Sequence, residues 1–165
     1  HHRPMDGGRR WCERHHRRLI RKPPSMSIPF GAKIPFVDHL GFSLEKFEGG
    51  ESELHFAPRP EHFNSFDVTH GGAVMTFLDV IMATAARSVD PDMGVVTIEM
   101  KTTFMRPAKV PAGQALVGKG HLQHRTRSMA FTEGSVFDAQ GQLCAHATGT
   151  FKYVSRRDTP SPWTD

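Results

Sequence analysis

The chain has 165 residues, of which 38% are hydrophobic and 23% are charged. This balance is ordinary for one globular domain and argues against a disordered or membrane-embedded chain. The formal net charge of +4 could suggest nucleic acid or anionic lipid as a partner, but it is not evenly spread. Residues 1–25 carry a net charge of +6, and the residues that follow carry a net charge of −2. We therefore expect a mildly acidic domain that binds neither nucleic acid nor a membrane.

The basic segment 1–25 has no apolar run long enough for a secretory signal or a membrane span. We expect it to lie outside a domain formed by residues 26–154, with 155–165 as a frayed tail. A transit peptide or a nucleic-acid-binding arm is the alternative for this leader. The two cysteines fall in different parts, Cys12 in the leader and Cys144 in the domain, so no disulfide framework is implied. A cytoplasmic location is the simplest expectation.

The first elements are short. Residues 29–40 form an apolar segment that predicts one or two helical turns. Residues 41–47 and 51–57 alternate apolar and polar side chains on either side of Gly49-Gly50. Glycine accepts the positive φ of tight turns, so this pattern predicts a β-hairpin.

A long helix is predicted next, over residues 73–89, which contain neither proline nor glycine and are apolar at almost every position. Such a helix is buried on most sides. Asp90-Pro91-Asp92 should end it, because proline disfavours helix at the residue before it.

Strand patterns then resume. In residues 96–104 we expect Val96, Ile98, Met100 and Phe104 on one face of a strand and Thr97, Glu99, Lys101 and Thr103 on the other. Residues 114–124, 128–138 and 143–154 predict an antiparallel meander. One long helix and about six strands indicate an α+β domain in which the sheet wraps the helix.

Asp79 is the anomaly of this sequence, because an unpaired carboxylate among apolar neighbours would carry a large desolvation cost. It could be a structural carboxylate bonded to Thr76 or to a nearby strand, or a catalytic one. The helix is opened by His70-Gly71-Gly72. Its free backbone N–H groups and the positive end of the helix dipole could polarise a carbonyl oxygen.

The spacing of these residues is specific. Asn64 lies six residues before His70, Asp79 lies nine residues after it, and Thr97 follows eighteen residues later. From about residue 40 to residue 154, the chain resembles the hotdog-fold acyl-CoA thioesterases of the phenylacetate-pathway (PaaI-like) type. The resemblance implies a hotdog fold, an antiparallel sheet wrapped around one long central helix.

The resemblance also implies roles for five residues. Asp79 would act as nucleophile or as general base for water, and the Gly71 N–H would polarise the thioester carbonyl. Asn64 would position the attacked group or water, and Thr97 would hydrogen-bond the carboxylate or water. His70 would either tie the loop to the helix or contact the substrate. Thioester hydrolysis of this kind needs no metal and no bound cofactor, since coenzyme A is part of the substrate.

Further substrate contacts are expected from Gly72 and Met75 at the start of the helix. Arg125 and Arg127 could contact the phosphates of coenzyme A, although a solvated turn explains them equally well. An apolar acyl pocket is expected from methionine and phenylalanine side chains, namely Met75, Phe77, Met82 and Met100. Their composition does not distinguish an aryl from an aliphatic acyl group.

A metal site is not expected. His121 and His124 are three residues apart on a predicted strand, which would put them on opposite faces, and no Cys or carboxylate completes a ligand set.

Helix geometry predicts a shared site. Gly71 and Asp79 are eight residues apart, which is about 12 Å along the axis at about 1.5 Å per residue. A carbonyl that accepts a hydrogen bond while a carboxylate attacks its carbon tolerates only about 6 Å between the two groups. Gly71 and Asn64 of one subunit should therefore act with Asp79 and Thr97 of another, in a homodimer at least, with a homotetramer as the larger alternative. The alternatives are a hotdog hydratase or dehydratase and a non-catalytic acyl-CoA-binding module.

Overall fold

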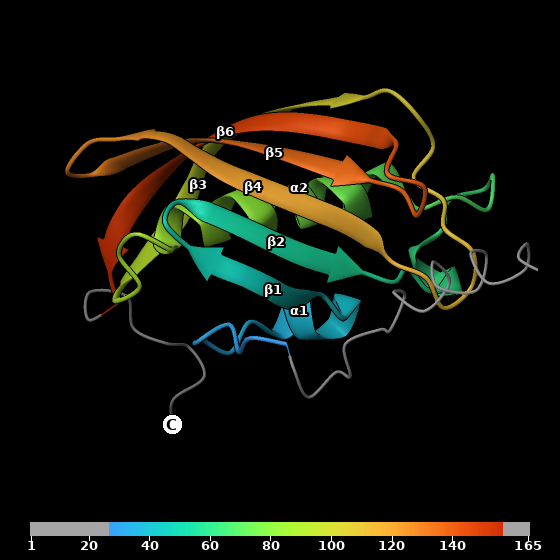
Figure 1. Ribbon diagram of the computed structural model, residues 1–165, viewed down its shortest axis with the longest axis horizontal. Helices are drawn as coiled ribbons and strands as arrows, with labels where there is room; N and C mark the ends of the chain where they lie inside the picture. Colours follow the sequence, from blue (N-terminus) through green and yellow to red (C-terminus); the bar gives the residue numbers. More distant parts are fainter. Residues whose placement is uncertain (1–26, 157–165) are drawn as a thin grey trace, which may run out of the picture.

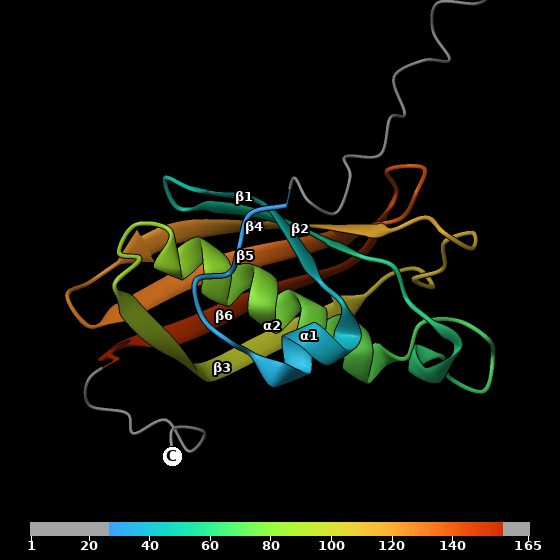
Figure 2. The ribbon, with the colours of Figure 1, turned by 90° about the horizontal axis from the view of Figure 1, so that it is seen from below.

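The computed structural model describes residues 27–156. Six strands form one antiparallel sheet in the order β1-β2-β4-β5-β6-β3, and α2 lies against one face of it (Figures 1 and 2). The predicted α+β architecture, a sheet wrapped around one long helix, is confirmed. In chain order the elements are α1 (Pro35–Leu40), β1 (Ser43–Glu48), β2 (Glu51–Phe56), the 3-10 turn η2 (Pro60–His62), α2 (Gly71–Arg87), β3 (Met93–Phe104), β4 (Leu116–Arg125), β5 (Met129–Phe137) and β6 (Leu143–Ser155).

The predicted domain limits are only partly covered by the described residues. The predicted leader, 1–25, lies outside them, as does most of the predicted tail. At the other end of the domain, β6 continues to Ser155, one residue beyond the predicted boundary. Within residues 27–156, no helix is both long and apolar enough to span a bilayer.

Glycines in the strands bring the sheet unusually close to α2. A Cβ atom on Gly118 would lie 2.1 Å from Cδ1 of Ile81, and one on Gly120 would lie 2.6 Å from the Ile81 carbonyl oxygen. No side chain fits at these positions. The close approach buries the inner face of α2 completely, including Phe77, Leu78 and Met82.

Both ends of the long helix differ by two residues from the prediction. The helix begins at Gly71 because His70 caps it, and it ends at Arg87, where the Ser88 N–H bonds the Thr84 carbonyl. The Ser88 hydroxyl in turn accepts the Gly50 N–H at 2.8 Å. Gly50 belongs to the predicted hairpin turn, in which Gly49 and Gly50 have φ angles of 61° and 83°. Two positive φ angles match the two-residue turn that joins antiparallel strands.

A β-bulge changes the faces of β3. The register shifts between Thr97 and Glu99, so Thr97 pairs with the buried Phe151, whereas Val96 pairs with the exposed Lys152. Residues opposite each other in an antiparallel pair share a face. Thr97 therefore faces α2 and Val96 faces away from it. The prediction that Val96 shares a face with Met100 and Phe104 is wrong, because Thr97 shares that face instead. Simple alternation failed because the bulge at Ile98 inserts one unpaired residue.

A second bulge corrects the prediction for the histidines of β4. The register shifts between Leu122 and His124, so His121 pairs with Glu133 and His124 with Phe131. Because these partners are two residues apart on β5, His121 and His124 lie on the same face. The prediction that they lie on opposite faces is wrong. Residues 27–156 contain no group of three His, Cys, Asp or Glu side chains arranged to hold a metal ion.

Candidate active site

The N-terminus of α2 has one open backbone donor. The side chain of His70, the N-cap residue, accepts the Gly72 N–H at Nδ1 over 2.8 Å. The His70 carbonyl accepts the next two N–H groups, from Ala73 at 2.9 Å and Val74 at 3.1 Å. Within residues 27–156 the Gly71 N–H has no hydrogen-bond partner. His70 thus takes the capping role considered for it, and Gly71 keeps the dipole-oriented donor that a carbonyl could use.

The preceding loop fixes the orientation of Asn64. Its Oδ1 accepts the Phe66 N–H at 2.9 Å and the Val68 N–H at 3.3 Å. Asp67 completes this turn with a left-handed φ of 58°, a conformation that Asp tolerates better than most residues. Since Oδ1 is occupied, the amide hydrogens on Nδ2 are what Asn64 can offer to a bound molecule.

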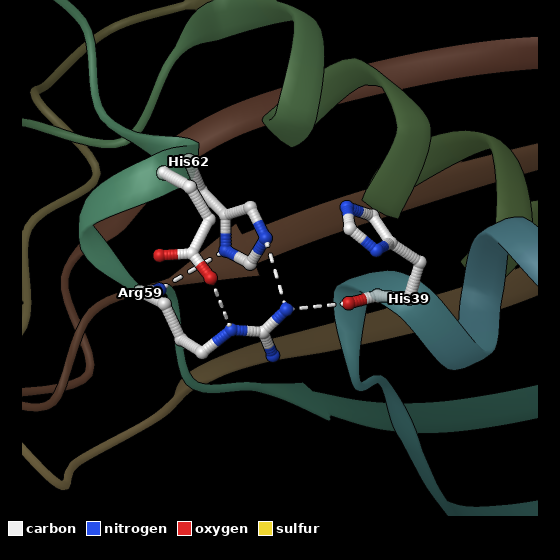
Figure 3. Close-up of polar contacts among 4 residues, drawn as sticks. His39, Arg59 and His62 are labelled. Carbon is white, nitrogen blue, oxygen red and sulfur yellow. Dashed lines mark hydrogen bonds and ion pairs between the residues drawn. The ribbon is translucent and has the colours of Figure 1, made fainter.

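A buried histidine anchors the same loop (Figure 3). His62 is 6% exposed, and its Nδ1 accepts the Arg59 N–H at 3.0 Å. The Arg59 guanidinium bonds the His39 carbonyl at 2.6 Å, while the His62 carbonyl accepts the His70 N–H at 2.8 Å. Burial and the Arg59 charge lower the pKa of His62, so its ring is neutral at pH 7 and Nδ1 can accept. This cluster connects α1 and η2 to the start of α2.

A pocket of about 390 Å³ opens at the N-terminus of α2 and contains both Asn64 and Gly71. Its other walls are mainly apolar and come from the loop, from α2 and from the ends of β3 and β6. They are Val68, Thr69, Val74, Phe104, Met105, Arg106, Pro107, Ala108, Cys144 and Ala145. Burial raises the pKa of the Cys144 thiol, which keeps it protonated at neutral pH.

Asp79 lies elsewhere on the helix and is bonded to β3. The Thr97 hydroxyl donates to Asp79 Oδ1 at 2.6 Å. Burial raises the pKa of the Asp79 carboxyl, and the bond from Thr97 opposes part of this rise. A raised pKa makes the ionised carboxylate a stronger base, and one hydroxyl holds it in a fixed orientation.

The structure thus forms two half-sites instead of one complete site. Gly71 is the first residue of α2 and Asp79 comes eight residues later in the same helix, which is about 12 Å along the axis. Asn64 and Gly71 share the pocket, whereas Asp79 and Thr97 do not contribute to its walls. One chain therefore holds a carbonyl-binding half and a carboxylate half that are too far apart to meet at one carbonyl.

The other predicted substrate contacts lie outside the pocket. The Gly72 N–H is occupied by His70, and Met75 is 37% exposed on α2. Arg125 lies over the Tyr153 ring at 4.3 Å and near Asp90 at 3.9 Å, so its guanidinium is already engaged. Arg127 is exposed in the turn between β4 and β5.

The predicted acyl pocket is wrong in part. Phe77 and Met82 are fully buried in the core against the sheet and do not line the pocket at the start of α2. Thr69 and Cys144 line the pocket instead, and nothing in their local sequence marks them, because loop closure and strand pairing bring them there. A second hollow of about 420 Å³ lies on the opposite face of the sheet, beside Lys119 and His121, and contains none of the predicted catalytic residues.

Comparisons with known proteins identify the family of this chain. Residues 66–145, which include the start of α2 and the Asp79–Thr97 pair, match the model of the thioesterase superfamily. A candidate esterase of Saccharolobus solfataricus is 31% identical over 74% of this chain and 78% of its own length. Acyl-coenzyme A thioesterase 13 of Homo sapiens is 31% identical over 54% of this chain and 64% of its own length.

A solved structure shows the same fold. The E. coli PaaI protein from the phenylacetic acid degradation operon superimposes with a TM-score of 0.68 at 18% identity, covering 74% of this chain and 86% of that one. At that identity the likeness concerns the fold alone. Together with the family match and the esterase relative, it confirms the resemblance noted in the sequence: the chain belongs to the thioesterase superfamily and has its hotdog fold.

Proposed function

We propose that this protein hydrolyses an acyl-CoA thioester to a free acid and coenzyme A. The observation that carries the proposal is the half-buried Asp79 carboxylate, fixed by Thr97 at 2.6 Å within an otherwise apolar helix. The same chain also has an open Gly71 N–H with Asn64 beside it in one pocket. These groups can donate hydrogen bonds to a thioester carbonyl oxygen. The similarity to an acyl-CoA thioesterase supports this substrate class.

The residues divide the reaction between them. The Gly71 N–H binds the carbonyl oxygen and stabilises the negative charge that develops on it. Asp79 either takes a proton from water, which then attacks the carbonyl carbon, or attacks that carbon itself to give an anhydride that water opens. In the first case the C–S bond breaks as the tetrahedral intermediate collapses, and the proton that Asp79 took from water passes to the leaving thiolate. In the second case the thiolate leaves when the anhydride forms, and the water that opens the anhydride supplies the proton that makes coenzyme A a thiol. Thr97 keeps the attacking carboxylate oxygen aligned in either case.

We further propose that the working enzyme is a homo-oligomer, a dimer or a dimer of dimers, in which each site combines the two half-sites of different subunits. Within residues 27–156, β3 forms one edge of the sheet and β1 forms the other, and Val96 and Ile98 of β3 are 43% and 55% exposed. A long, apolar and unpaired edge strand is a surface that proteins usually cover. A second copy paired along β3 would cover it and bring a second α2 close to the first.

The free Cys144 thiol is compatible with the reducing cytoplasm.

The test is Asp79→Asn, assayed by detection of free thiol with phenylacetyl-CoA, acetyl-CoA and palmitoyl-CoA. We expect loss of most turnover on whichever substrate the wild type uses, because the amide is neither a nucleophile nor a base. Asp92→Asn, an equivalent change at an exposed turn, is the control and should retain activity. Wild-type turnover by Asp79→Asn would reject the assignment.

Thermal unfolding adds an independent check on Asp79. Because its pKa is raised in the folded chain, the ionised carboxylate is less favourable there than in the unfolded chain. The folded state therefore loses stability as the pH rises through the folded pKa, and the loss is complete above that pKa. Asp79→Asn removes this cost, so its melting temperature should equal or exceed that of the wild type while its activity falls.

A further inference from the structure

The hydroxyl of Thr69 lacks a partner. Thr69 is 5% exposed, and among residues 27–156 its Oγ1 is one of three buried side-chain atoms without a hydrogen bond. The other two are on Arg87 and Thr102, neither of which lines the pocket at the start of α2, whereas Thr69 does. Leaving a buried hydroxyl unpaired costs roughly 1–3 kcal/mol. A cost of this size at a pocket wall indicates a partner that the free chain does not supply.

The donors around this pocket are few. The N–H groups of Gly72, Ala73 and Val74 are all bonded to His70, which leaves the Gly71 N–H as the only backbone donor in the first turn of α2 without a partner among residues 27–156. The developing oxyanion of a thioester can accept more than one hydrogen bond, so a side-chain donor beside the Gly71 N–H would stabilise it further. Thr69 is two residues from Gly71, and its main-chain N–H is already bonded to the Ala108 carbonyl at 3.2 Å.

We infer that Thr69 is a further catalytic residue, whose hydroxyl donates a hydrogen bond to the thioester carbonyl oxygen beside the Gly71 N–H. The inference rests on the proposed hydrolysis. In the free chain the hydroxyl oxygen is shielded from solvent. To reach the bound carbonyl, the hydroxyl must turn toward the pocket by rotation about the single side-chain torsion of Thr69, between staggered rotamers.

The kinetic consequence is specific. A bond to the carbonyl oxygen strengthens as negative charge develops, so its loss lowers kcat and leaves KM nearly unchanged. Removing one donor to an oxyanion typically lowers kcat by roughly 100-fold or more. Because Gly71 and Asn64 remain, we expect Thr69→Val to lower kcat by at least about tenfold.

The matched variants are Thr69→Val, which replaces the hydroxyl with a methyl group of similar shape, and Thr69→Ser, which keeps the hydroxyl. Thr69→Val should have an equal or higher melting temperature, because it removes an unpaired polar group. Thr69→Ser should retain most of the wild-type kcat. Wild-type kcat in Thr69→Val, an equal loss in Thr69→Ser, or a clear fall in the melting temperature of Thr69→Val would overturn the inference.

A spectroscopic measurement separates this inference from the proposed hydrolysis. Phenylacetyl-CoA with an isotopic label at its carbonyl carbon is bound to Asp79→Asn, which should not consume it, and its infrared carbonyl band is recorded. The band should move to higher wavenumber in Asp79→Asn/Thr69→Val, because one donor is lost. An unchanged band overturns the role of Thr69 even if the wild type is an active hydrolase. If the wild type releases no thiol, the hydrolysis is rejected, while the band shift still decides whether Thr69 bonds the carbonyl.

Discussion

Gly71→Pro removes the proposed carbonyl donor with little change to the helix. Gly71 is the first residue of α2, the position where proline is best tolerated. The preceding His70 has φ −57° and ψ 137°, an extended conformation that proline favours in the residue before it. A Cβ atom at Gly71 would lie 3.6 Å from Cζ of Phe104, which is ordinary contact. Gly71→Ala, which adds the Cβ but keeps the N–H, is therefore a matched control.

The two half-sites can be tested by mixing subunits. Asp79→Asn and Gly71→Pro should each be nearly inactive, because every site contains one damaged half. In a mixed dimer, one site combines the intact Gly71 of the first chain with the intact Asp79 of the second, and the other site is doubly damaged. Random pairing makes about half of the dimers mixed, so about a quarter of wild-type activity should return under two-fold symmetry.

The assay is release of free thiol. Each variant is first refolded alone and assayed; the two are then mixed in equal amounts, unfolded together, refolded together and assayed again. Absence of recovery, with each parent shown to be folded and dimeric by circular dichroism and sedimentation, would refute the shared site. Full activity in Gly71→Pro alone would refute the role of the N–H. Gly71→Ala should remain active, which separates loss of the donor from crowding against Phe104.

Two further predictions concern pH and packing. Thr97→Val removes a hydrogen bond that lowers the pKa of Asp79, so the acidic limb of the pH–kcat profile should move to higher pH. Thr103→Val, on the opposite face of β3, is the control and should leave the profile unchanged. An unmoved limb in Thr97→Val would show that the rate does not depend on the ionisation of Asp79. Gly120→Ala would place a Cβ 2.6 Å from the Ile81 carbonyl oxygen, so chemical denaturation should show a loss of at least about 2 kcal/mol in the free energy of unfolding. For Gly94→Ala, whose nearest neighbour would lie at 3.4 Å, the loss should stay within about 1 kcal/mol; equal losses would contradict the packing argument.

Local patterns were sufficient to predict the elements. The apolar run without glycine or proline predicted α2, and the two glycines at positive φ predicted the turn between β1 and β2. Asp79 and the two glycines at the start of that helix could also be identified from the sequence. A carboxylate among apolar residues, and glycines in a helix, are both unfavourable locally, which indicates a functional site. These signals depend on neighbours within a few residues, and a single sequence contains all of that information.

What only the tertiary structure decided depends on contacts between distant segments. The bulge at Ile98 turns Thr97 toward Asp79, and it is specified by pairing with β6 more than forty residues later. Thr69 and Cys144 meet in one pocket because a loop before α2 closes over the start of β6. Whether a hydroxyl is buried without a partner is likewise a property of the packed chain. One unpaired residue reverses every face beyond it, so strand alternation could not decide which side chains meet α2.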